Sequence, residues 1–234
     1  IHHLTSDKNG LSNKTSLYYG FAQDKKSRIW VGSVAGSGID IIDEKNGSYQ
    51  TISKENGLAS TAVDDLIIDD KQRIWISHND TKVLSVIDQS EGIIKQLVFA
   101  QGMYNGGTNA IFEDSKEQVW ISQNGIYLFN EKKESTKRLA FNKGLSGIAG
   151  TFLEDDDGLI WVSTNSGLDI IDEKNGTIKH ILLKGITGTE IANLLKDQNG
   201  NIWIGTSGNG LFMVNTAAST ITSFTETNGL ANEV

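Results

Sequence analysis

The sequence predicts an all-β fold of five repeated units, and three observations carry this prediction. Tryptophan recurs at intervals of 45, 45, 41 and 42 residues, at Trp30, Trp75, Trp120, Trp161 and Trp203. Each Trp lies in a short run of apolar, mostly β-branched residues, which is typical of a strand buried on both faces. The chain has 25 glycines and no proline, so its tight turns must be built from Gly, Asn, Asp and Ser. One such phrase every forty-odd residues is typical of a β-propeller blade.

Within each unit, the pattern predicts four short strands joined by polar turns. The tryptophan strand follows a turn that begins with an aspartate six residues before the Trp. We expect this carboxylate to accept hydrogen bonds from backbone amides of the turn, and Gly or Asn to adopt the left-handed conformation there. The aspartates are Asp24, Asp69, Asp114, Asp155 and Asp197. A third strand, such as GIDIID at 38–43, and an outer strand, such as SYQTI at 48–52, complete the unit.

The first strand of each unit lies between a Gly-hydrophobic pair, such as Gly57-Leu58, and the turn aspartate. Residues 189–197, TEIANLLKD, also fit a helical turn by periodicity alone. We expect a strand there, because the equivalent segments of the other units read as strands. Two places after each Trp the residue is Gly or Ser, which lets neighbouring backbones approach closely.

The repeats predict one domain over residues 1–234, with blade boundaries set by the Gly-hydrophobic pairs. The blades lie at about 11–56, 57–101, 102–143, 144–184 and 185–228, and residues 1–10 form an extra outer strand. Each Trp is expected to pack against the neighbouring blade. Two arrangements fit, a closed five-blade ring and an arc of a larger propeller whose end faces would favour self-association. We favour the closed ring.

The composition of the chain argues against some classes of binding partner. The net charge is −8, which argues against nucleic acid, whose phosphates require a basic face, and against an anionic membrane surface. The chain has no cysteine, so it has neither disulfides nor thiolate ligands. No apolar run approaches the length of about 20 residues that a membrane-spanning helix needs. No signal-peptide pattern is present at Ile1, so we expect any targeting segment to lie outside this sequence.

The repeated phrases resemble the two-component regulator propeller repeat. The matching residues are His3-Leu4-Thr5, Gly10-Leu11-Ser12-Asn13, Gln23-Asp24 and Ile29-Trp30-Val31-Gly32, and the best-matching complete unit is residues 197–215. The resemblance extends over nearly the whole chain. It implies a propeller that senses ligands in the periplasm, outside the inner membrane, joined to a signalling output such as a histidine kinase or diguanylate cyclase. Many members of that family respond to glycans.

A ligand site is expected where two sets of loops meet at the mouth of the propeller channel. One set follows the tryptophan strands and the other surrounds the Gly-hydrophobic pairs. Their amide and aromatic side chains suit a sugar, which offers hydroxyl groups and a flat apolar face. The alternative is that these residues only shape turns. The candidate ligand-binding residues are Asn13, His78, Asn79, Tyr104, Asn105, Asn124, Asn165 and Asn209.

Patterns for catalysis, metals and cofactors are weak in this sequence. Segments 155–158 and 197–201 resemble the start of a calcium loop but lack its closing Glu. His78, with Asp80 two residues on, is the one broad candidate for a general base, and no Gly-x-Ser-x-Gly elbow occurs. We therefore expect no catalytic residue, metal or cofactor. Three functions stay open: a ligand-sensing propeller, which we favour, a polysaccharide lyase or hydrolase on this fold, and a structural protein-docking propeller.

Overall fold

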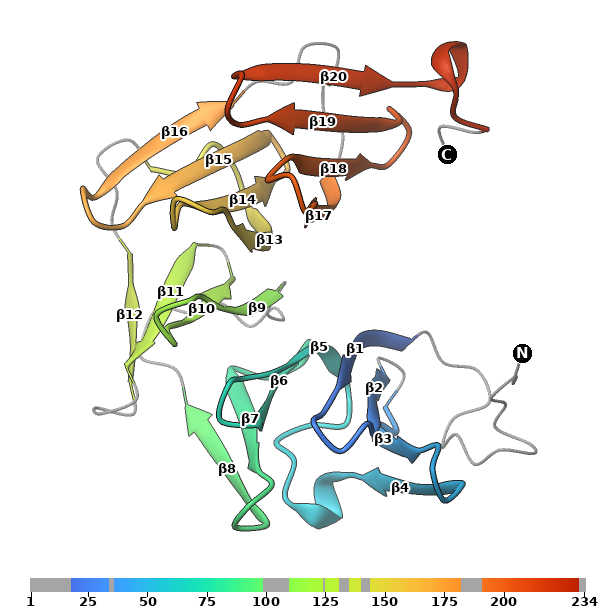
Figure 1. Cartoon of the computed structure of the whole chain (residues 1–234). Coiled ribbons are helices and arrows are strands. Elements are labelled where there is room, and N and C mark those ends of the chain that lie inside the picture. The colour runs from blue at the N-terminus through green and yellow to red at the C-terminus, as the bar shows by residue number, and fades with distance from the viewer. Residues whose placement is uncertain are drawn as a thin grey trace. The chain divides into compact units, whose positions relative to one another are not determined.

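The chain folds into five four-stranded antiparallel sheets in the computed structural model (Figure 1). Each sheet consists of four strands that are consecutive in sequence and ordered as neighbours. This confirms the predicted all-β propeller fold with four strands in each unit, and we call the sheets blades 1 to 5. The structure describes residues 18–33, 36–98, 110–123, 125–130, 135–139, 144–181 and 191–231.

The strands follow the repeat from blade to blade. Blade 1 contains β1 (Tyr18–Gln23), β2 (Ile29–Ser33), β3 (Gly38–Asp43) and β4 (Ser48–Ile52), and blade 2 contains β5 (Val63–Ile68), β6 (Arg73–His78), β7 (Val83–Asp88) and β8 (Ile93–Val98). Blade 3 contains β9 (Ala110–Glu113), β10 (Val119–Ser122), β11 (Ile126–Asn130) and β12 (Ser135–Arg138). Blade 4 contains β13 (Ala149–Glu154), β14 (Ile160–Thr164), β15 (Gly167–Asp172) and β16 (Thr177–Ile181). Blade 5 contains β17 (Ile191–Lys196), β18 (Ile202–Thr206), β19 (Leu211–Asn215) and β20 (Thr220–Phe224).

The ambiguous segment at 189–197 contains strand β17, as the register of the repeats predicts. Two single-turn 3-10 helices, η1 (Lys54–Asn56) and η3 (Glu226–Asn228), follow the outer strands β4 and β20. Among the described residues, no helix is long and apolar enough to cross a membrane.

The chain divides into two compact units, one of residues 1–123 and 128–137 and the other of 124–127 and 138–234. The first holds blades 1 and 2 and most of blade 3, and the second holds blades 4 and 5. The closed ring and the blade boundaries stay predictions, and the expected outer strand at 1–10 lies outside the described residues.

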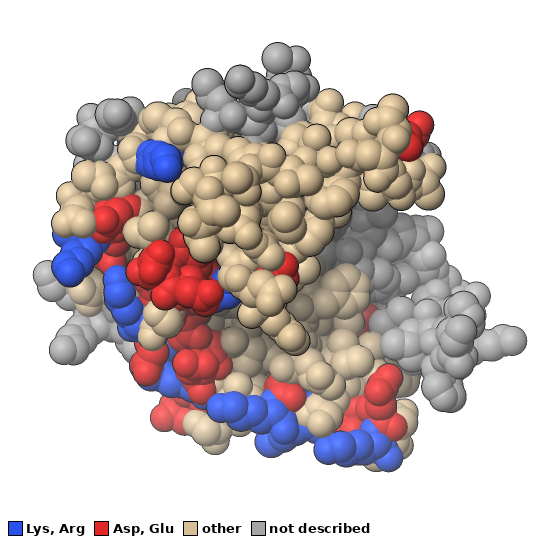
Figure 2. Space-filling view, turned by 45° about the horizontal axis from the view of Figure 1, so that its top comes forward, with Lys and Arg blue, Asp and Glu red and all other residues tan. Residues whose placement is uncertain are grey.

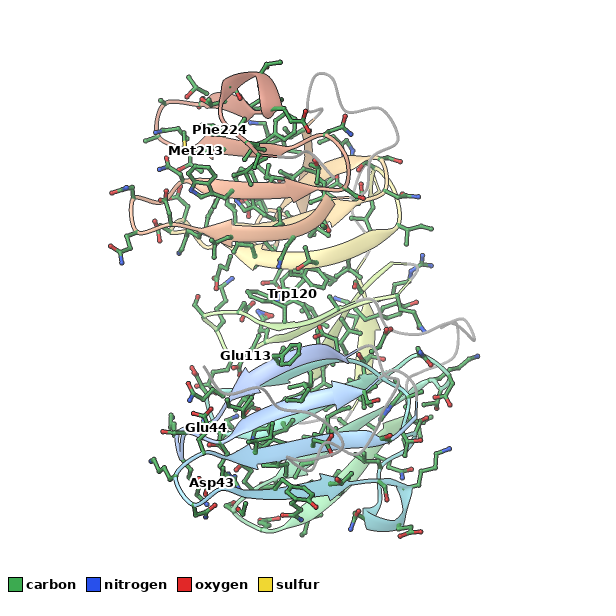
Figure 3. The ribbon with its side chains drawn as sticks, turned by 90° about the vertical axis from the view of Figure 1, so that its right-hand side faces the viewer. Asp43, Glu44, Glu113, Trp120, Met213 and Phe224 are labelled. Carbon is green, nitrogen blue, oxygen red and sulfur yellow. The ribbon has the colours of Figure 1, made fainter. Side chains whose placement is uncertain are left out.

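Each unit has a core in which a tryptophan contacts the next blade. In the first unit, Trp30 is 2% exposed and clusters with Leu66 and Ile74 of blade 2. In the second, Trp161 is 3% exposed and clusters with residues of blade 5. Trp75 meets Phe129 of blade 3 edge-on, with 5.0 Å between ring centroids. Trp120, labelled in Figure 3, lies on β10 and has no exposed surface. The expected packing of Trp between blades is therefore confirmed for blades 1, 2 and 4.

In every blade, the turn aspartate accepts a hydrogen bond from the Trp that follows it. The indole Nε1–H donates to Oδ2 at 3.0, 2.8, 2.8, 2.7 and 2.9 Å in blades 1 to 5. The other carboxylate oxygen accepts backbone amides, as Asp24 does from Lys26 and Arg28 at 2.9 Å each. The amide bonds confirm the predicted turn, whereas the indole bond was not predicted. The aspartate thus joins the hairpin turn to the buried Trp.

The prediction that Gly or Asn takes the left-handed residue of these turns is correct only in part. In blades 4 and 5, glycine holds this position, Gly158 with φ 74° and Gly200 with φ 77°. In blades 1 to 3, Ser27, Gln72 and Glu117 adopt φ values of 66°, 63° and 60°. Hydrogen bonds to the turn aspartate, at least three in each of these blades, hold this backbone, so an ordinary L-residue bears a strained conformation there.

The innermost strand contains a β-bulge in blades 1, 2, 4 and 5. The small residue two places after the Trp fastens the bulge in two of these blades. Ser77 Oγ accepts the Asp65 amide at 2.9 Å, and Ser163 Oγ accepts the Thr151 amide at 2.8 Å. In blade 1 the bulge residue is Gly20, where an added Cβ would lie 2.8 Å from the Leu66 nitrogen. This glycine therefore permits the close approach of β1 and β5.

Candidate functional site

The two predicted sets of loops lie together within blades 2 and 4. In blade 2, Ser60 Oγ donates to Asp80 Oδ2 at 2.8 Å, and the Asn79 amide donates to the Ala62 carbonyl at 3.1 Å. In blade 4, Asn165 Oδ1 accepts the Ile148 amide at 2.8 Å, and the hydroxyls of Ser146 and Thr164 lie 2.8 Å apart. Hydrogen bonds therefore join the two sets of loops in both blades, and in blade 4 a side chain of one set holds the backbone of the other.

His78 does not present its ring on these loops as expected. It is the last residue of β6 and is 1% exposed. Its Nε2 lies 2.9 Å from Ser85 Oγ, and Nδ1 has no hydrogen-bond partner among the described residues. Burial lowers the pKa of His78 to about 4, although the charge of Asp80 and the Ala62 backbone oppose this shift. His78 is therefore neutral at pH 7 and shielded from solvent.

The other three described candidates have different surroundings. Asn79 is half-buried, Asn165 is exposed but uses its carbonyl oxygen to hold Ile148, and the half-buried Asn209 donates its backbone amide to Thr206 Oγ1 at 3.2 Å. Asn13, Tyr104, Asn105 and Asn124 lie outside the described residues. The structure thus places Asn79 and Asn165 at equivalent loops of two blades.

A buried polar group inside the third strand anchors the loop at the Gly-hydrophobic pair, and sequence reasoning missed it. Asp169, with no exposure, accepts the Ser146 amide at 2.8 Å and lies 2.7 Å from His180 Nδ1. In blade 2, Ser85 takes the same register position and accepts the Ala59 amide at 3.0 Å. The signal in the sequence is a polar residue inside an otherwise apolar strand, as in GLDIID.

Two adjacent carboxylates lie on the innermost strand of blade 2. Asp65 accepts the amides of Leu66 at 2.8 Å and, in blade 3, Ile111 at 3.1 Å, whereas Asp64 has no hydrogen-bond partner among the described residues. Burial raises the pKa of both groups to about 6. In blade 5 the same positions hold Ala192 and Asn193. The pair is therefore specific to blade 2.

Neither a metal site nor a nucleic-acid surface is supported by the described part of the chain. No group of three or more His, Asp or Glu within it could hold a metal ion. Figure 2 shows Lys and Arg interspersed with Asp and Glu along the lower left of one face, so that charges of both signs alternate there. Such a mixed surface differs from the single-sign basic stripe that nucleic-acid binding needs.

The described fold defines the class as a β-propeller, and solved structures agree. A catalytically inactive virginiamycin B lyase from Staphylococcus aureus with quinupristin is 18% identical, with a TM-score of 0.78 over 95% of this chain and 73% of that one. The extracellular domain of a hybrid two component system from B. thetaiotaomicron is 22% identical, with a TM-score of 0.78 over 94% of this chain. PorZ, of the Porphyromonas gingivalis type-IX secretion system, is 15% identical, with a TM-score of 0.76 over 98%.

These identities establish the fold and leave the activity open. This chain spans 32% of the B. thetaiotaomicron domain and 37% of PorZ, about a third of each. No curated protein sequence matches the chain significantly. The family described as "Two component regulator propeller" matches residues 185–208, which include the start of the unit that resembles the repeat best. Residues 185–208 are therefore similar to a two-component regulator propeller repeat.

Proposed function

We propose that this chain is the extracytoplasmic ligand-sensing part of a bacterial signalling protein. It binds an oligosaccharide or another small molecule and passes the signal to an output domain outside this segment. The regulator repeat at 185–208 and the likeness to extracellular domains of two component systems support this proposal. Binding would act by shifting the population of conformations that the output domain responds to.

One observation carries the non-enzymatic part of the proposal. In blades 2 and 4, the polar side chains at the loops are engaged in holding other loops, as Ser60, Asp80 and Asp169 are. His78 is buried and neutral, so it lacks the solvent contact that a general base needs. Fixed loops with hydrogen-bonded backbones suit recognition, and we assign Asn79, Asn165 and Asn209 each to contact a ligand at the loops of its own blade.

The test combines binding and turnover in the same samples. Thermal unfolding of the purified chain is measured with each member of a library of neutral and acidic oligosaccharides. Each mixture is then analysed by mass spectrometry. A true ligand at 100 times its Kd should raise the stability by about 2.7 kcal/mol and leave the oligosaccharide mass unchanged. Conversion of an oligosaccharide would refute the non-enzymatic proposal.

A lyase is the second candidate, because the fold matches virginiamycin B lyase over 95% of this chain. Its reacting histidine would be His180, a third exposed and paired with the buried Asp169, rather than His78. If turnover is found, His180→Gln should abolish it, because glutamine can still donate a hydrogen bond to the buried Asp169 but cannot act as an acid or base. Unchanged turnover in this variant would remove His180 from the chemistry.

A further inference from the structure

A cavity of about 360 Å³ lies between the outer halves of blades 1 and 2, within one compact unit. Strands β3 and β4 supply one wall and β7 and β8 the other. The turn between β1 and β2 and the short helix η1 add Lys26 and Asn56. Its volume is within the range of about 300–1,000 Å³ that small-molecule sites occupy. We call it the blade 1–2 groove.

The groove has an apolar floor and a polar rim. Ile41, Ile52, Ile87 and Ile94 line the floor, and the first three are less than a tenth exposed. The rim carries Lys26, Arg28, Gln50, Asn56 and Gln89. A sugar ring presents both chemistries, because its C–H face is apolar and its edge carries hydroxyl groups.

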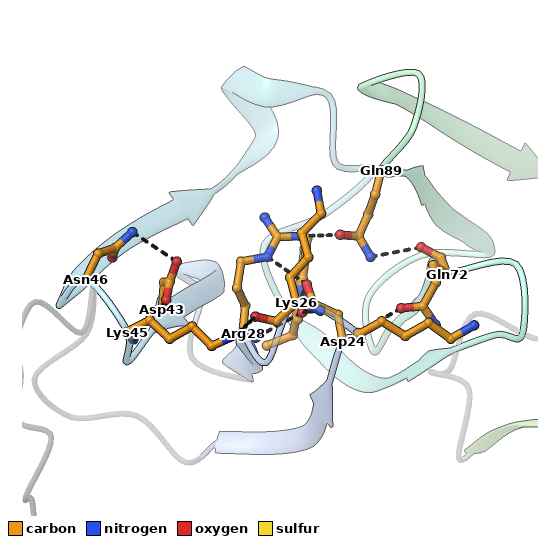
Figure 4. Close-up of polar contacts among 10 residues, drawn as sticks. Asp24, Lys26, Arg28, Asp43, Lys45, Asn46, Gln72 and Gln89 are labelled. Carbon is orange, nitrogen blue, oxygen red and sulfur yellow. Dashed lines mark hydrogen bonds and ion pairs between the residues drawn. The ribbon is translucent and has the colours of Figure 1, made fainter.

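Arg28 is fixed in position before any ligand arrives. Its Nε donates to Asp24 Oδ2 at 2.7 Å, and its guanidinium lies 5.4 Å from the centre of the Trp30 ring. Its Nη2 donates to Gln89, whose own amide donates to the Gln72 carbonyl at 2.9 Å (Figure 4). The arginine side chain remains 24% exposed. A guanidinium held in this way binds a carboxylate with little loss of conformational freedom.

Two more polar side chains of the rim are available. Neither the Lys26 ammonium nor the Gln50 amide has a partner among the described residues, and both residues are exposed. The carboxylate in the groove wall, Asp88, is engaged by its own turn, since Oδ1 accepts the Ser90 amide at 2.8 Å and hydroxyl at 2.6 Å. These donors are neutral and leave Asp88 ionised, so the groove holds one carboxylate beside the Arg28 guanidinium and the Lys26 ammonium, and this ammonium has no ion-pair partner among the described residues.

We propose that the blade 1–2 groove binds an acidic sugar, a unit of an oligosaccharide that bears a carboxylate. Arg28 and Lys26 take the carboxylate, Gln50 and Asn56 take hydroxyl groups, and the isoleucine floor packs against the ring. This inference rests on the proposed sensing function and names its ligand class. None of Asn79, Asn165 and Asn209 lines the groove, so the two assignments can fail independently.

The test measures the affinity of the purified chain for digalacturonate by isothermal titration calorimetry. Galactobiose serves as the matched neutral disaccharide, and acetate as the carboxylate without a sugar. Lys26→Gln removes the unpaired charge without breaking any hydrogen bond of its side chain. Lys174→Gln is the matched control, because this lysine is also exposed in a turn but belongs to blade 4.

The proposal predicts saturable binding of digalacturonate and much weaker binding of galactobiose and acetate. Lys26→Gln should weaken digalacturonate binding about tenfold, as loss of a charged hydrogen bond does, and Lys174→Gln should leave it unchanged. Equal effects of the two substitutions, equal affinity for acetate, or no binding of digalacturonate would overturn the proposal. Binding of neutral oligosaccharides that Lys26→Gln does not change would retain the sensing function and refute this site alone.

Discussion

Blades 1 and 2 differ from blades 4 and 5 at the residue four places after the turn aspartate. Arg28 and Arg73 occupy this position in blades 1 and 2, where Nε donates to the aspartate at 2.7 and 2.6 Å. Both guanidinium groups also lie over the Trp of their blade, at 5.4 and 5.2 Å from the ring centre. Blade 4 has Leu159 there and blade 5 has Asn201.

The comparison shows which interaction every blade contains and which one varies between blades. All five blades contain the hydrogen bond from the Trp indole to the turn aspartate, so this bond is a common feature of the blade structure. In blade 1, burial opposes ionisation of Asp24, but hydrogen bonds from Trp30 and Arg28 outweigh it and lower its pKa. In blade 5, hydrogen bonds from Asn201 and Trp203 lower the pKa of Asp197 to about 2. Asp24, which has an arginine partner, and Asp197, which has none, therefore both ionise more readily than an ordinary aspartate.

The largest loss of stability should follow from replacing the buried Trp, which is present in blades 1 and 2 and in blades 4 and 5. Trp30→Ala and Trp161→Ala should each lower the free energy of unfolding by about 3–5 kcal/mol, because each removes a buried ring from the contact between two blades. Chemical denaturation of both variants measures this loss. A small effect in either blade would contradict the shared role of the Trp.

Replacing the turn aspartate should cost more stability in blade 1 than in blade 4. Asp155→Ala leaves the Trp161 indole and two amides without an acceptor, which should cost about 1–3 kcal/mol. Asp24→Ala also leaves the guanidinium of Arg28 without its carboxylate, so we expect a cost about 1 kcal/mol higher. Denaturation of the two variants under the same conditions gives the difference. Equal losses would mean that the ion pair between Arg28 and Asp24 does not contribute to stability.

The first strands of blades 2 and 5 should differ in how their contribution to stability depends on pH. Blade 5 has Ala192 where blade 2 has Asp64, whose pKa burial raises to about 6 from 3.8. The ionised form is penalised in the folded state, so the penalty is full above pH 6 and disappears as the pH falls below 4. Asp64→Ala should therefore raise stability at pH 7 by about 1–2 kcal/mol.

The pH dependence provides the control for this substitution. Unfolding of the wild type and the Asp64→Ala variant is measured from pH 4 to pH 8, and the difference in stability should shrink towards pH 4. A difference that does not change with pH would show that Asp64 acts through packing and not through its charge.

The smallest effect concerns the strained turn residue. Ser27 in blade 1 has φ 66°, and Gly158 takes the equivalent position in blade 4 with φ 74°. Ser27→Gly should stabilise the chain by about 0.5–1 kcal/mol, because glycine adopts a positive φ without the steric cost. The thermal midpoint measures the gain. A loss of stability would show that the serine side chain offsets its strain.

The sequence predicts the fold far better than the site. Trp30 and its four equivalents repeat in a phrase that specifies a buried strand, so the sheets follow from local patterns. The bond from Trp30 to Asp24 joins residues on two sides of a turn, and the sequence shows only their constant spacing. The burial of His78 depends on how blade 2 packs, which its position beside a loop does not reveal.

The groove could not be predicted, because it exists only where two blades meet. Arg28 and Gln89 lie 61 residues apart in sequence, and each belongs to a turn that reads as ordinary polar surface. No single repeat contains the floor, which needs isoleucines from β3, β4, β7 and β8. Repeat patterns describe one blade at a time, so properties shared by two blades require the structure.

We propose that Arg28 contributes to ligand binding in the groove and that the blade folds without it, and one pair of variants tests this directly. Arg28→Leu and Arg73→Leu both introduce the residue that blade 4 carries, and Arg73 does not line the groove. We predict that both variants lose a similar amount of stability, about 1–3 kcal/mol, because each leaves a buried aspartate without its arginine donor. Only Arg28→Leu should weaken digalacturonate binding in calorimetry. Equal affinities of the two variants for digalacturonate would contradict the account.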